Sequence, residues 1–285
     1  MKRIIIIGCG FAGLFAAKKL KKSNHEIIVM DKKQTFDFLP LLPDILGNKI
    51  KPENVSYPIK KLSLKYNFNF LNEEVISIDY KNNSIATNKN SITYDYLLIA
   101  AGSETNFFNN KKIKKIAYKL DDIADAIKIT KEVNNYKSIL IVGGGYTGVE
   151  IATNLKVNYP DKDIIIIEKN SVILQALPAS MQEYVINNLK KLNINVITNS
   201  AIENIDTKDS MIIWAPGVKP PAFTGGKRIN INEYLQFNNN CFVAGDSANF
   251  IYKNAPLRMA VQFSIMQGRL AAKNILNQIQ NLPLK

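Results

Sequence analysis

The stretch that decides the fold is KRIIIIGCGFAGLFAAKKL, residues 2–20. Residues 4–7 are all isoleucine, and an apolar run that stops at a glycine predicts a short strand buried on both faces. Gly8, Gly10 and Gly13 follow in GxGxxG spacing, and apolar residues then recur at a helical period. A strand, a glycine turn and a helix in this order predict a dinucleotide-binding unit.

Each part of this unit has a physical role in holding a dinucleotide. Gly8 allows the tight turn, Gly10 lets a pyrophosphate approach the backbone, and Gly13 lets the helix pack closely on the strand. The helix then begins at Phe11 and Ala12, where backbone N–H groups and a partial positive charge face the phosphates. About two dozen residues after the first glycine, the strand 26–30 ends in Asp31, with Lys32 beside it. The Asp31 carboxylate is expected to accept the two hydroxyls of a ribose.

The same pattern occurs a second time. Residues 138–142 predict a strand, residues 143–148 read GGGYTG, and a helix is expected to run to about residue 158. The strand 164–167 then ends in Glu168, at the same spacing as the first acid. The expected contacts to a second dinucleotide from this motif are Gly143, Gly145, Tyr146, Thr147, Gly148 and Glu168.

Each half closes in a similar apolar strand followed by small residues. Residues 94–102 end in Ala100-Ala101-Gly102 and residues 211–217 end in Ala215-Pro216-Gly217, where the backbone must pass close to something. The tail then returns to the first half through a strand that ends in Gly245-Asp246 and a helix from about Arg258 to Ile279, with Pro256 at its start.

The predicted fold class is therefore α/β, with two Rossmann-like dinucleotide-binding domains, the second inserted in the first. Residues 68–93 add a small β-meander with a turn at Asn82–Asn83. The expected domains are residues 1–104 with 220–285, and residues 105–219.

Composition limits the chemistry. The two cysteines, Cys9 and Cys241, are far apart, which fits a reducing cytoplasm and argues against a disulfide framework. A single histidine, His25, and no clustered cysteines argue against a zinc site or a Ser-His-Asp triad, so no metal is expected. No apolar run approaches the ~18 residues of a membrane span, and no signal peptide precedes the first strand.

The net charge of +13 has several explanations. An acidic partner, an anionic membrane surface or nucleic acid would each account for it. The plain alternative is a coding bias toward lysine and asparagine, since lysines are spread along the chain.

Residues 34–47, QTFDFLPLLPDILG, are too apolar for a free loop, and Pro40 and Pro43 prevent a long helix. This segment is expected to lie against a flat apolar group or, alternatively, to plug the core.

With these motifs identified, the chain resembles the two-dinucleotide flavoprotein oxidoreductases and, within them, the type II NADH dehydrogenases. The resemblance spans nearly the whole chain in order, through DFLPLL (37–42), YDYLLIAAGSETNFF (94–108), AYKLDDIADAI (117–127), GGGYTGVEIA (143–152), IIWAPGV (212–218) and QGRLAAKNI (267–275).

The resemblance implies a role for each half. The first would hold FAD, with Asp31 at its ribose, Val75 near the adenine and Asp246 near the ribityl and phosphate groups, while Pro40 and Leu41 would line the flavin ring. The remaining expected contacts in this half are Lys32, Ala100, Gly102 and Gly245. The second would hold NADH, with Gly217 as a further expected contact, and Glu168 would repel the 2′-phosphate of NADPH.

The resemblance also implies two residues on the acceptor side. Gln262 matches a family glutamine near the place where quinone meets the flavin, and Glu150 matches a family glutamate near the nicotinamide and quinone pocket. The N-terminus of the last helix would steady the negative charge of reduced flavin. The plain alternatives are a glutamate favoured by the helix dipole and a glutamine that forms hydrogen bonds in the core.

The chain departs from the family pattern at several places. Met266 replaces the second glutamine of the last helix, and Tyr146 replaces a proline in the second glycine loop. Only about a dozen residues separate Thr198 from Met211, so the meander of the second half is unusually short for a dinucleotide-binding unit. The chain ends at Lys285, where the family continues with a membrane-attaching segment.

Three classes of function follow. The first is an NADH:quinone reductase, the second is an NADH-dependent reductase of a small acidic electron carrier or of oxygen, and the third is a non-catalytic flavoprotein that binds an acidic partner. The expected location is cytoplasmic, with peripheral contact to the inner face of a membrane and a homodimer both left open. Nucleic acid is not expected as a partner.

Overall fold

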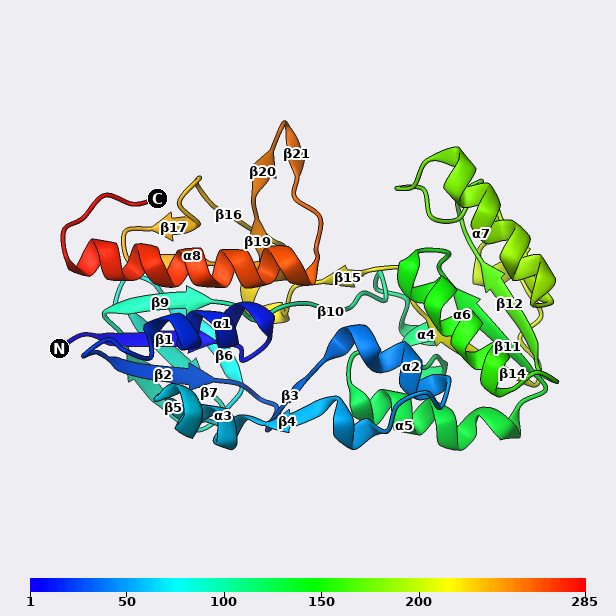
Figure 1. The fold of residues 1–285 in the computed structure, drawn as a ribbon, viewed down its shortest axis with the longest axis horizontal. Helices are drawn as coiled ribbons and strands as arrows, with labels where there is room; N and C mark the ends of the chain where they lie inside the picture. The colour runs from blue at the N-terminus through cyan, green and yellow to red at the C-terminus, as the bar shows by residue number, and fades with distance from the viewer. The chain divides into compact units, whose positions relative to one another are not determined.

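The computed structural model describes residues 1–285. The chain folds into two compact units, and each unit has layers of helices and β-sheet (Figure 1). The first unit contains residues 1–36, 57–104 and 219–285, and the second contains residues 37–56 and 105–218. The predicted fold class is confirmed, because each unit is built around a largely parallel sheet with helices packed on it.

The first unit has a six-stranded sheet in the order β17-β18-β9-β1-β2-β5. Its strands are β1 (Arg3–Ile7), β2 (Glu26–Met30), β5 (Asn69–Leu71), β9 (Tyr96–Ile99), β17 (Gln236–Asn238) and β18 (Cys241–Val243). All neighbours run parallel except β17, which is antiparallel to β18 at the edge. The isoleucine run 4–7 is buried in the central strand, as a strand covered on both faces requires.

Alternate side chains of β1 point to two different cores, because successive residues of a strand face opposite sides. Ile4 and Ile6 pack in one core with α1 (Phe11–Leu20), α3 (Ile59–Tyr66) and α8 (Val261–Ile279). Ile5 and Ile7 pack in another core with the meander on the opposite face. The meander strands are β6 (Val75–Asp79), β7 (Ser84–Thr87) and β8 (Ser91–Thr93).

The second unit has a four-stranded parallel sheet in the order β13-β12-β11-β14. Its strands are β11 (Ser138–Val142), β12 (Asp163–Ile167), β13 (Ile194–Ile197) and β14 (Ser210–Trp214). Its helices are α2 (Leu42–Leu46), α4 (Lys111–Ile116), α5 (Ile123–Glu132), α6 (Tyr146–Asn158) and α7 (Ala179–Lys191).

The two sheets repeat one arrangement. In each, the strand before the glycine turn (β1 or β11) lies between the strand that ends in the acid (β2 or β12) and the strand that ends in small residues (β9 or β14). The internal duplication expected from the sequence is therefore present in the topology.

Short strand pairs complete the chain. They are β3 (Thr35–Asp37) with β4 (Ser56–Pro58), β10 (Glu104–Thr105) with β15 (Val218–Lys219), β16 (Ile229–Asn230) with β19 (Ala248–Asn249), and β20 (Ile251–Tyr252) with β21 (Ala255–Pro256). The first two pairs lie where the chain passes from one unit to the other.

Three details differ from the expectations. Residues 37–56, assigned to the first domain from the sequence, belong to the second unit, because Leu42, Ile45 and Leu46 are buried in its core. Pro256 does not start the last helix: it lies in the hairpin β20–β21, and α8 begins at Val261. Residues 69–71 join the main sheet beside β2, so the meander proper spans residues 75–93.

Candidate functional site

The first glycine turn is shaped by close backbone approaches. Gly8 has φ +96°, and a Cβ there would lie 2.3 Å from the carbonyl oxygen of Ala100. A Cβ on Gly13 would lie 1.8 Å from the carbonyl oxygen of Gly8, whereas one on Gly10 would meet no atom within 4 Å. Two glycines therefore allow the chain to pack, and Gly10 leaves open space where a ligand phosphate can approach.

Asp31 closes this turn from the end of β2. Its Oδ2 accepts the N–H of Cys9 at 2.7 Å and its Oδ1 accepts the N–H of Lys33 at 2.8 Å. Loss of hydration raises the pKa of Asp31, and these backbone hydrogen bonds and nearby Lys33 and Lys32 oppose the shift. Ribose hydroxyls that donate to its remaining lone pairs would favour the charged form further.

The small residues after β9 lie against the same turn. A Cβ on Gly8 would lie within 3 Å of backbone atoms of both Ala100 and Ala101, so residue 8 must be glycine for the two segments to pass this closely. The following Ser103 donates its hydroxyl to Asp246 Oδ2 at 2.8 Å, and Ser247 Oγ donates to the carbonyl of Gly102 at 3.0 Å. The loop after β9 and the loop after β18 are thereby joined at one end of the sheet.

A hollow opens at the start of α8, beside Asp246. Residues that line it include Arg228, Gly245, Asp246, Arg258, Ser264 and Gln267. Gln267 is buried and its Oε1 accepts the N–H of Gly245 at 2.8 Å, which holds the loop against the helix. Arg228 donates Nε to the carbonyl of Ala248 at 2.7 Å; burial lowers its pKa and the charge of Asp246 opposes this. Two arginines and a helix N-terminus make this hollow suitable for an anionic, hydroxyl-rich chain.

The second glycine turn repeats the first. Gly143 has φ +103°, and a Cβ there would lie 2.7 Å from Cα of Pro216. A Cβ on Gly148 would lie 1.9 Å from the carbonyl oxygen of Gly143, and one on Gly145 would meet nothing within 4 Å. The acid has the same partner as before: Glu168 Oε2 accepts the N–H of Gly144 at 2.7 Å, the residue after the first glycine.

The helices after the two turns begin without a side-chain cap, as α3, α7 and α8 also do, whereas α4 and α5 are capped. Asn110 caps α4 and Asp122 caps α5 through side-chain hydrogen bonds. In contrast, Gly10 and Gly145 precede α1 and α6, which have no side-chain cap and no acidic residue in the first turn. A helix start without such a cap offers backbone N–H donors to an outside acceptor, and a phosphate is the acceptor that suits it.

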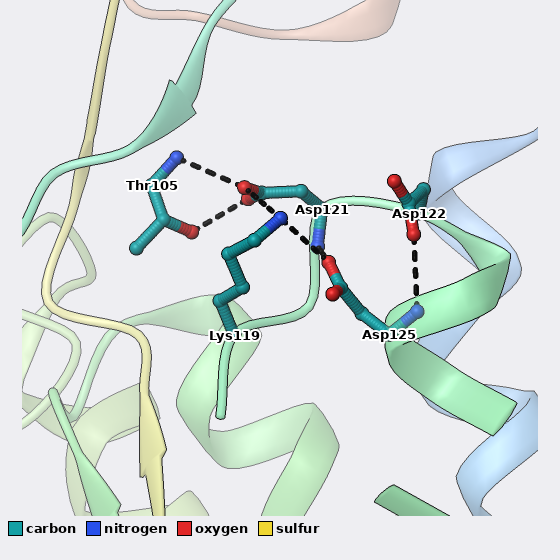
Figure 2. Close-up of polar contacts among 5 residues, drawn as sticks. All are labelled: Thr105, Lys119, Asp121, Asp122 and Asp125. Atoms are coloured by element: carbon teal, nitrogen blue, oxygen red, sulfur yellow. Dashed lines mark hydrogen bonds and ion pairs between the residues drawn. The ribbon is translucent and has the colours of Figure 1, made fainter. Parts of the chain in front are cut away.

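A charged cluster fixes the segment that enters the second unit (Figure 2). Asp121 accepts from the N–H and the hydroxyl of Thr105, and Lys119 Nζ lies 2.9 Å from both Asp121 and Asp125. Burial opposes the charge of Lys119, but the two carboxylates outweigh it and raise the pKa of Lys119. Asp122 caps α5 by accepting the N–H of Asp125, so this acidic start of the helix is structural.

The remaining residues singled out from the sequence lie in varied settings. Val75 is buried at the start of β6. Pro40 is exposed and Leu41 is half-buried against the second unit's core, while the neighbouring Phe38 and Leu39 are 40% and 46% exposed. The core-filling alternative therefore holds for Leu42 to Leu46, whereas Phe38 and Leu39 before them are exposed, and their contact with a flat apolar group stays a prediction.

The two residues expected on the acceptor side are both exposed. Gln262 lies in the first turn of α8 in the first unit, and Glu150 lies on α6 in the second. Loss of hydration raises the pKa of Glu150, and the charge of Asp44 on α2 adds to it. Tyr146 and Thr147, in the first turn of α6, are also exposed.

Sequence reasoning missed three side chains of the first unit: Ser103, Arg228 and Gln267. Ser103 directly follows the small-residue motif, and Gln267 begins the stretch QGRLAAKNI, so both lay beside recognised signals. Arg228 lies in a stretch without a recognisable pattern, and only folding brings it to Asp246.

Comparison with known proteins identifies the family. The family model for pyridine nucleotide-disulphide oxidoreductases matches residues 2–271. The chain belongs to this family. It is a pyridine nucleotide-dependent flavin oxidoreductase, and binding of FAD and NAD(P)H is typical of the family. The expected enzyme class is thereby confirmed.

The names of distant relatives differ in the electron acceptor that they imply. The type II NADH:quinone oxidoreductase of Staphylococcus saprophyticus is 23% identical over 336 residues, which cover 99% of this chain and 84% of that protein. The NADH oxidase of Methanocaldococcus jannaschii is 29% identical over 315 residues, which cover 96% of this chain and 70% of that protein.

A solved structure, NDH2 from Plasmodium falciparum in complex with NADH, has a TM-score of 0.79 and 25% identity. The match covers 87% of this chain, which spans 64% of that chain's length. The water-forming NADH oxidase from Lactobacillus brevis, bound to NADH, has a TM-score of 0.85 at 20% identity over 97% of this chain and 70% of that chain, which shows a shared fold.

Two further observations concern metals and membranes. Nowhere do three or more histidine, cysteine, aspartate or glutamate side chains come together as a metal site would need. None of the helices combines the length and the apolar character that crossing a membrane requires.

Proposed function

We propose that the chain is an NADH dehydrogenase-like flavoprotein that passes electrons from NADH through FAD to a quinone-like acceptor. Binding of two nucleotides is supported by one observation: each unit has the same arrangement of a glycine turn, a helix without a side-chain cap and a carboxylate. In each unit the open glycine, Gly10 or Gly145, stands where a pyrophosphate would need room.

In the first unit, FAD would contact both loops at the end of the sheet. The N–H groups at the start of α1 would bind the pyrophosphate, Asp31 the adenosine ribose, and Val75 the adenine. Asp246, oriented by Ser103, would accept a hydroxyl of the ribityl chain beside Arg228 and Arg258. The start of α8 would face the flavin and stabilise negative charge that develops on it.

In the second unit, the start of α6 would bind the pyrophosphate of NADH. Glu168 would accept the adenosine ribose hydroxyls, and its charge disfavours the 2′-phosphate of NADPH. FAD, when bound, supplies the hydride-accepting chemistry, and the protein's part is to bind, orient and exclude water.

A quinone-like acceptor is supported by two features of this chain. Phe38, Leu39 and Pro40 present an apolar surface that suits a flat ring. The raised pKa of Glu150 lets this carboxyl hold a proton closer to neutral pH, which a proton donor to a reduced acceptor needs. Gln262 would add a hydrogen-bond donor on the acceptor side.

A second candidate is transfer to oxygen or to a small acidic electron carrier. The relative named NADH oxidase, at 29% identity, supports oxygen. The basic charge of the chain, +13, supports an acidic carrier through electrostatic steering.

An anaerobic titration of the flavin-loaded protein with NADH tests the proposal. We expect stoichiometric bleaching of the flavin, followed by fast reoxidation on mixing with a short-chain quinone. A reduced flavin that reacts with quinone no faster than with anaerobic buffer would exclude the quinone-like acceptor. The same sample mixed with oxygen and with a small iron–sulfur protein then decides between the alternatives.

A further inference from the structure

The excess positive charge is confined to one of the two units. The first unit contains 21 lysines and arginines and 9 acidic residues, a net charge of +12. The second contains 16 basic and 15 acidic residues, a net charge of +1. A coding bias toward lysine would raise the net charge of both units alike. The charge of the first unit therefore needs an explanation specific to that unit.

Within the first unit, the charge gathers on the helices that cover one face of the sheet. Neither α1, α3 nor α8 contains an acidic residue, and residues 247–285 contain five basic residues and no acid. The three helices pack side by side over one core, which leaves their outer sides to form a common surface.

Four cations on this surface are linked because they lie over two aromatic rings. Arg269 and Lys18 lie over the ring of Phe15, and Lys18, Lys21 and Lys65 lie over the ring of Tyr66. Lys19 and Lys285 both lower the pKa of Lys273, with Lys285 the larger cause, so these ammonium groups are crowded. We call this surface the basic face, made of Lys18, Lys19, Lys21, Lys65, Arg269 and Lys273.

The basic face lacks compensating carboxylates. None of its six cations forms an ion pair, whereas Arg3 pairs with Glu26 and Lys2 pairs with Asp95 elsewhere in the same unit. Leu64 of α3, next to Lys65, is 82% exposed, and Lys60 and Lys61 are exposed beside it. On a helical wheel Leu64 falls between Lys60 and Lys61, opposite the buried Ile59 and Leu62.

We propose that the basic face docks on an anionic lipid bilayer, with Leu64 entering the interfacial layer. Charge complementarity favours an anionic surface, and clusters of four to eight basic residues on helices are typical of those that bind anionic lipids. Long lysine side chains beside an exposed leucine also suit the boundary between headgroups and acyl chains.

The composition argues against the other polyanions. Protein–protein interfaces are depleted in lysine, and five of the six cations here are lysine. Binding of single-stranded nucleic acid uses uncovered aromatic rings for base stacking, whereas Phe15 and Tyr66 are already covered by the cations of this surface. A quinone or oxygen as acceptor leaves this inference unchanged, whereas an acidic carrier would compete for the same charged surface.

The test is flotation of the flavin-loaded protein with vesicles of 30% phosphatidylglycerol in phosphatidylcholine, or of phosphatidylcholine alone. We expect binding to the anionic vesicles that weakens as salt rises, and little binding to the neutral ones. The variant Lys18→Gln/Lys21→Gln/Lys65→Gln should bind on the order of 100-fold more weakly, at about fivefold for each lysine.

The chain offers a matched control. Helix α4 of the second unit exposes Lys111, Lys112 and Lys115, and their triple replacement by glutamine removes the same net charge. That variant should keep nearly full vesicle binding, while Leu64→Gln should weaken it with no change in charge. Flavin content and NADH-dependent bleaching, expected to be unchanged in all variants, show that each has folded.

Equal binding to neutral and anionic vesicles would overturn the proposal. So would equal losses in the α4 control and in the basic-face variant, because net charge alone would then explain the binding. The proposal would also be overturned if single-stranded RNA, or an acidic protein such as a ferredoxin, bound more tightly than the vesicles and lost that binding in the basic-face variant. The surface would then be assigned to that partner.

Discussion

The two open glycines allow a test that separates nucleotide binding from folding. Gly10 and Gly145 both have extended backbone angles, φ −72° and −76°, and a Cβ on either meets no protein atom within 4 Å. Replacement of either by valine should therefore change the free energy of unfolding of the ligand-free protein by no more than about 1 kcal/mol, the size of an N-cap effect. For a domain of this size that is a shift of roughly 2–4 °C in Tm.

Gly13 provides the contrast. A Cβ on Gly13 would lie 1.8 Å from the carbonyl oxygen of Gly8, so the helix would have to move away from the turn. Overpacking of this kind costs about 1–3 kcal/mol or more, and Gly13→Ala should lower the Tm of the ligand-free protein by roughly 6–12 °C at the upper end of that range. Differential scanning calorimetry of protein stripped of flavin measures both effects.

The effects on nucleotide binding should differ between the two units. Gly10→Val should lose flavin by more than tenfold in affinity, at least about 1.4 kcal/mol, because its side chain occupies the place of the pyrophosphate. Gly145→Val should keep its flavin but bleach only at much higher NADH concentration. Full flavin occupancy in a folded Gly10→Val would refute the assignment of FAD to the first unit. Loss of flavin in Gly145→Val instead would reverse the two assignments.

Three other outcomes are expected. NADH should bleach the flavin much faster than NADPH, and Glu168→Ala should narrow that preference by about 1–3 kcal/mol, as measured from the two kcat/KM values; equal rates in the unaltered protein would contradict it. Gln262→Ala and Glu150→Gln should leave flavin reduction intact but slow reoxidation by quinone roughly 10-fold in single-turnover stopped-flow, whereas slowed reduction would place both residues on the NADH side. The pKa of Glu150 is raised in the folded protein by lost hydration and by Asp44, so its contribution to stability is present at low pH and is lost as pH rises through the folded pKa. Glu150→Gln should therefore raise the Tm at pH 7 and have little effect below about pH 4; a Tm difference that grows toward low pH would show that the shift has the opposite sign.

The sheets were predictable because their strands carry strong local signals. Continuous isoleucine runs in β1 and β12, each followed by glycine or acid, allow few other structures, and the predicted bounds agree with the structure to within a residue or two. The glycine spacing also predicted the close approaches, since Gly8 and Gly143 each pack on the small residues that end a neighbouring strand.

The differences arise where the partner is distant in sequence. Leu42, Ile45 and Leu46 form an apolar stretch that either unit could bury, and nothing local indicates that they pack with α5 and α6 of the second. Pro256 is compatible with a helix start or with an edge strand, and the pairing of Tyr252 with Ala255 decides for the strand. The hydrogen bonds of Ser103 to Asp246 and of Gln267 to Gly245 likewise depend on tertiary packing.

The duplication also determines how substitutions of the two acids must be interpreted. In both units the carboxylate accepts the N–H of the residue after the first glycine, at 2.7 Å from Cys9 to Asp31 and at 2.7 Å from Gly144 to Glu168. Each acid therefore holds its own turn in shape before it meets any ribose, and its removal weakens nucleotide binding even without a lost ribose contact. The ratio of the kcat/KM values for NADH and NADPH avoids this ambiguity. The two nucleotides share the pyrophosphate that the turn binds, and they differ only at the 2′ position. Loosening of the turn should affect both nucleotides alike and cancel in the ratio of their kcat/KM values. A change in that ratio on replacing Glu168 therefore reports what the carboxylate does at the 2′ position, which is its hydrogen bond to the ribose hydroxyl together with its repulsion of a 2′-phosphate.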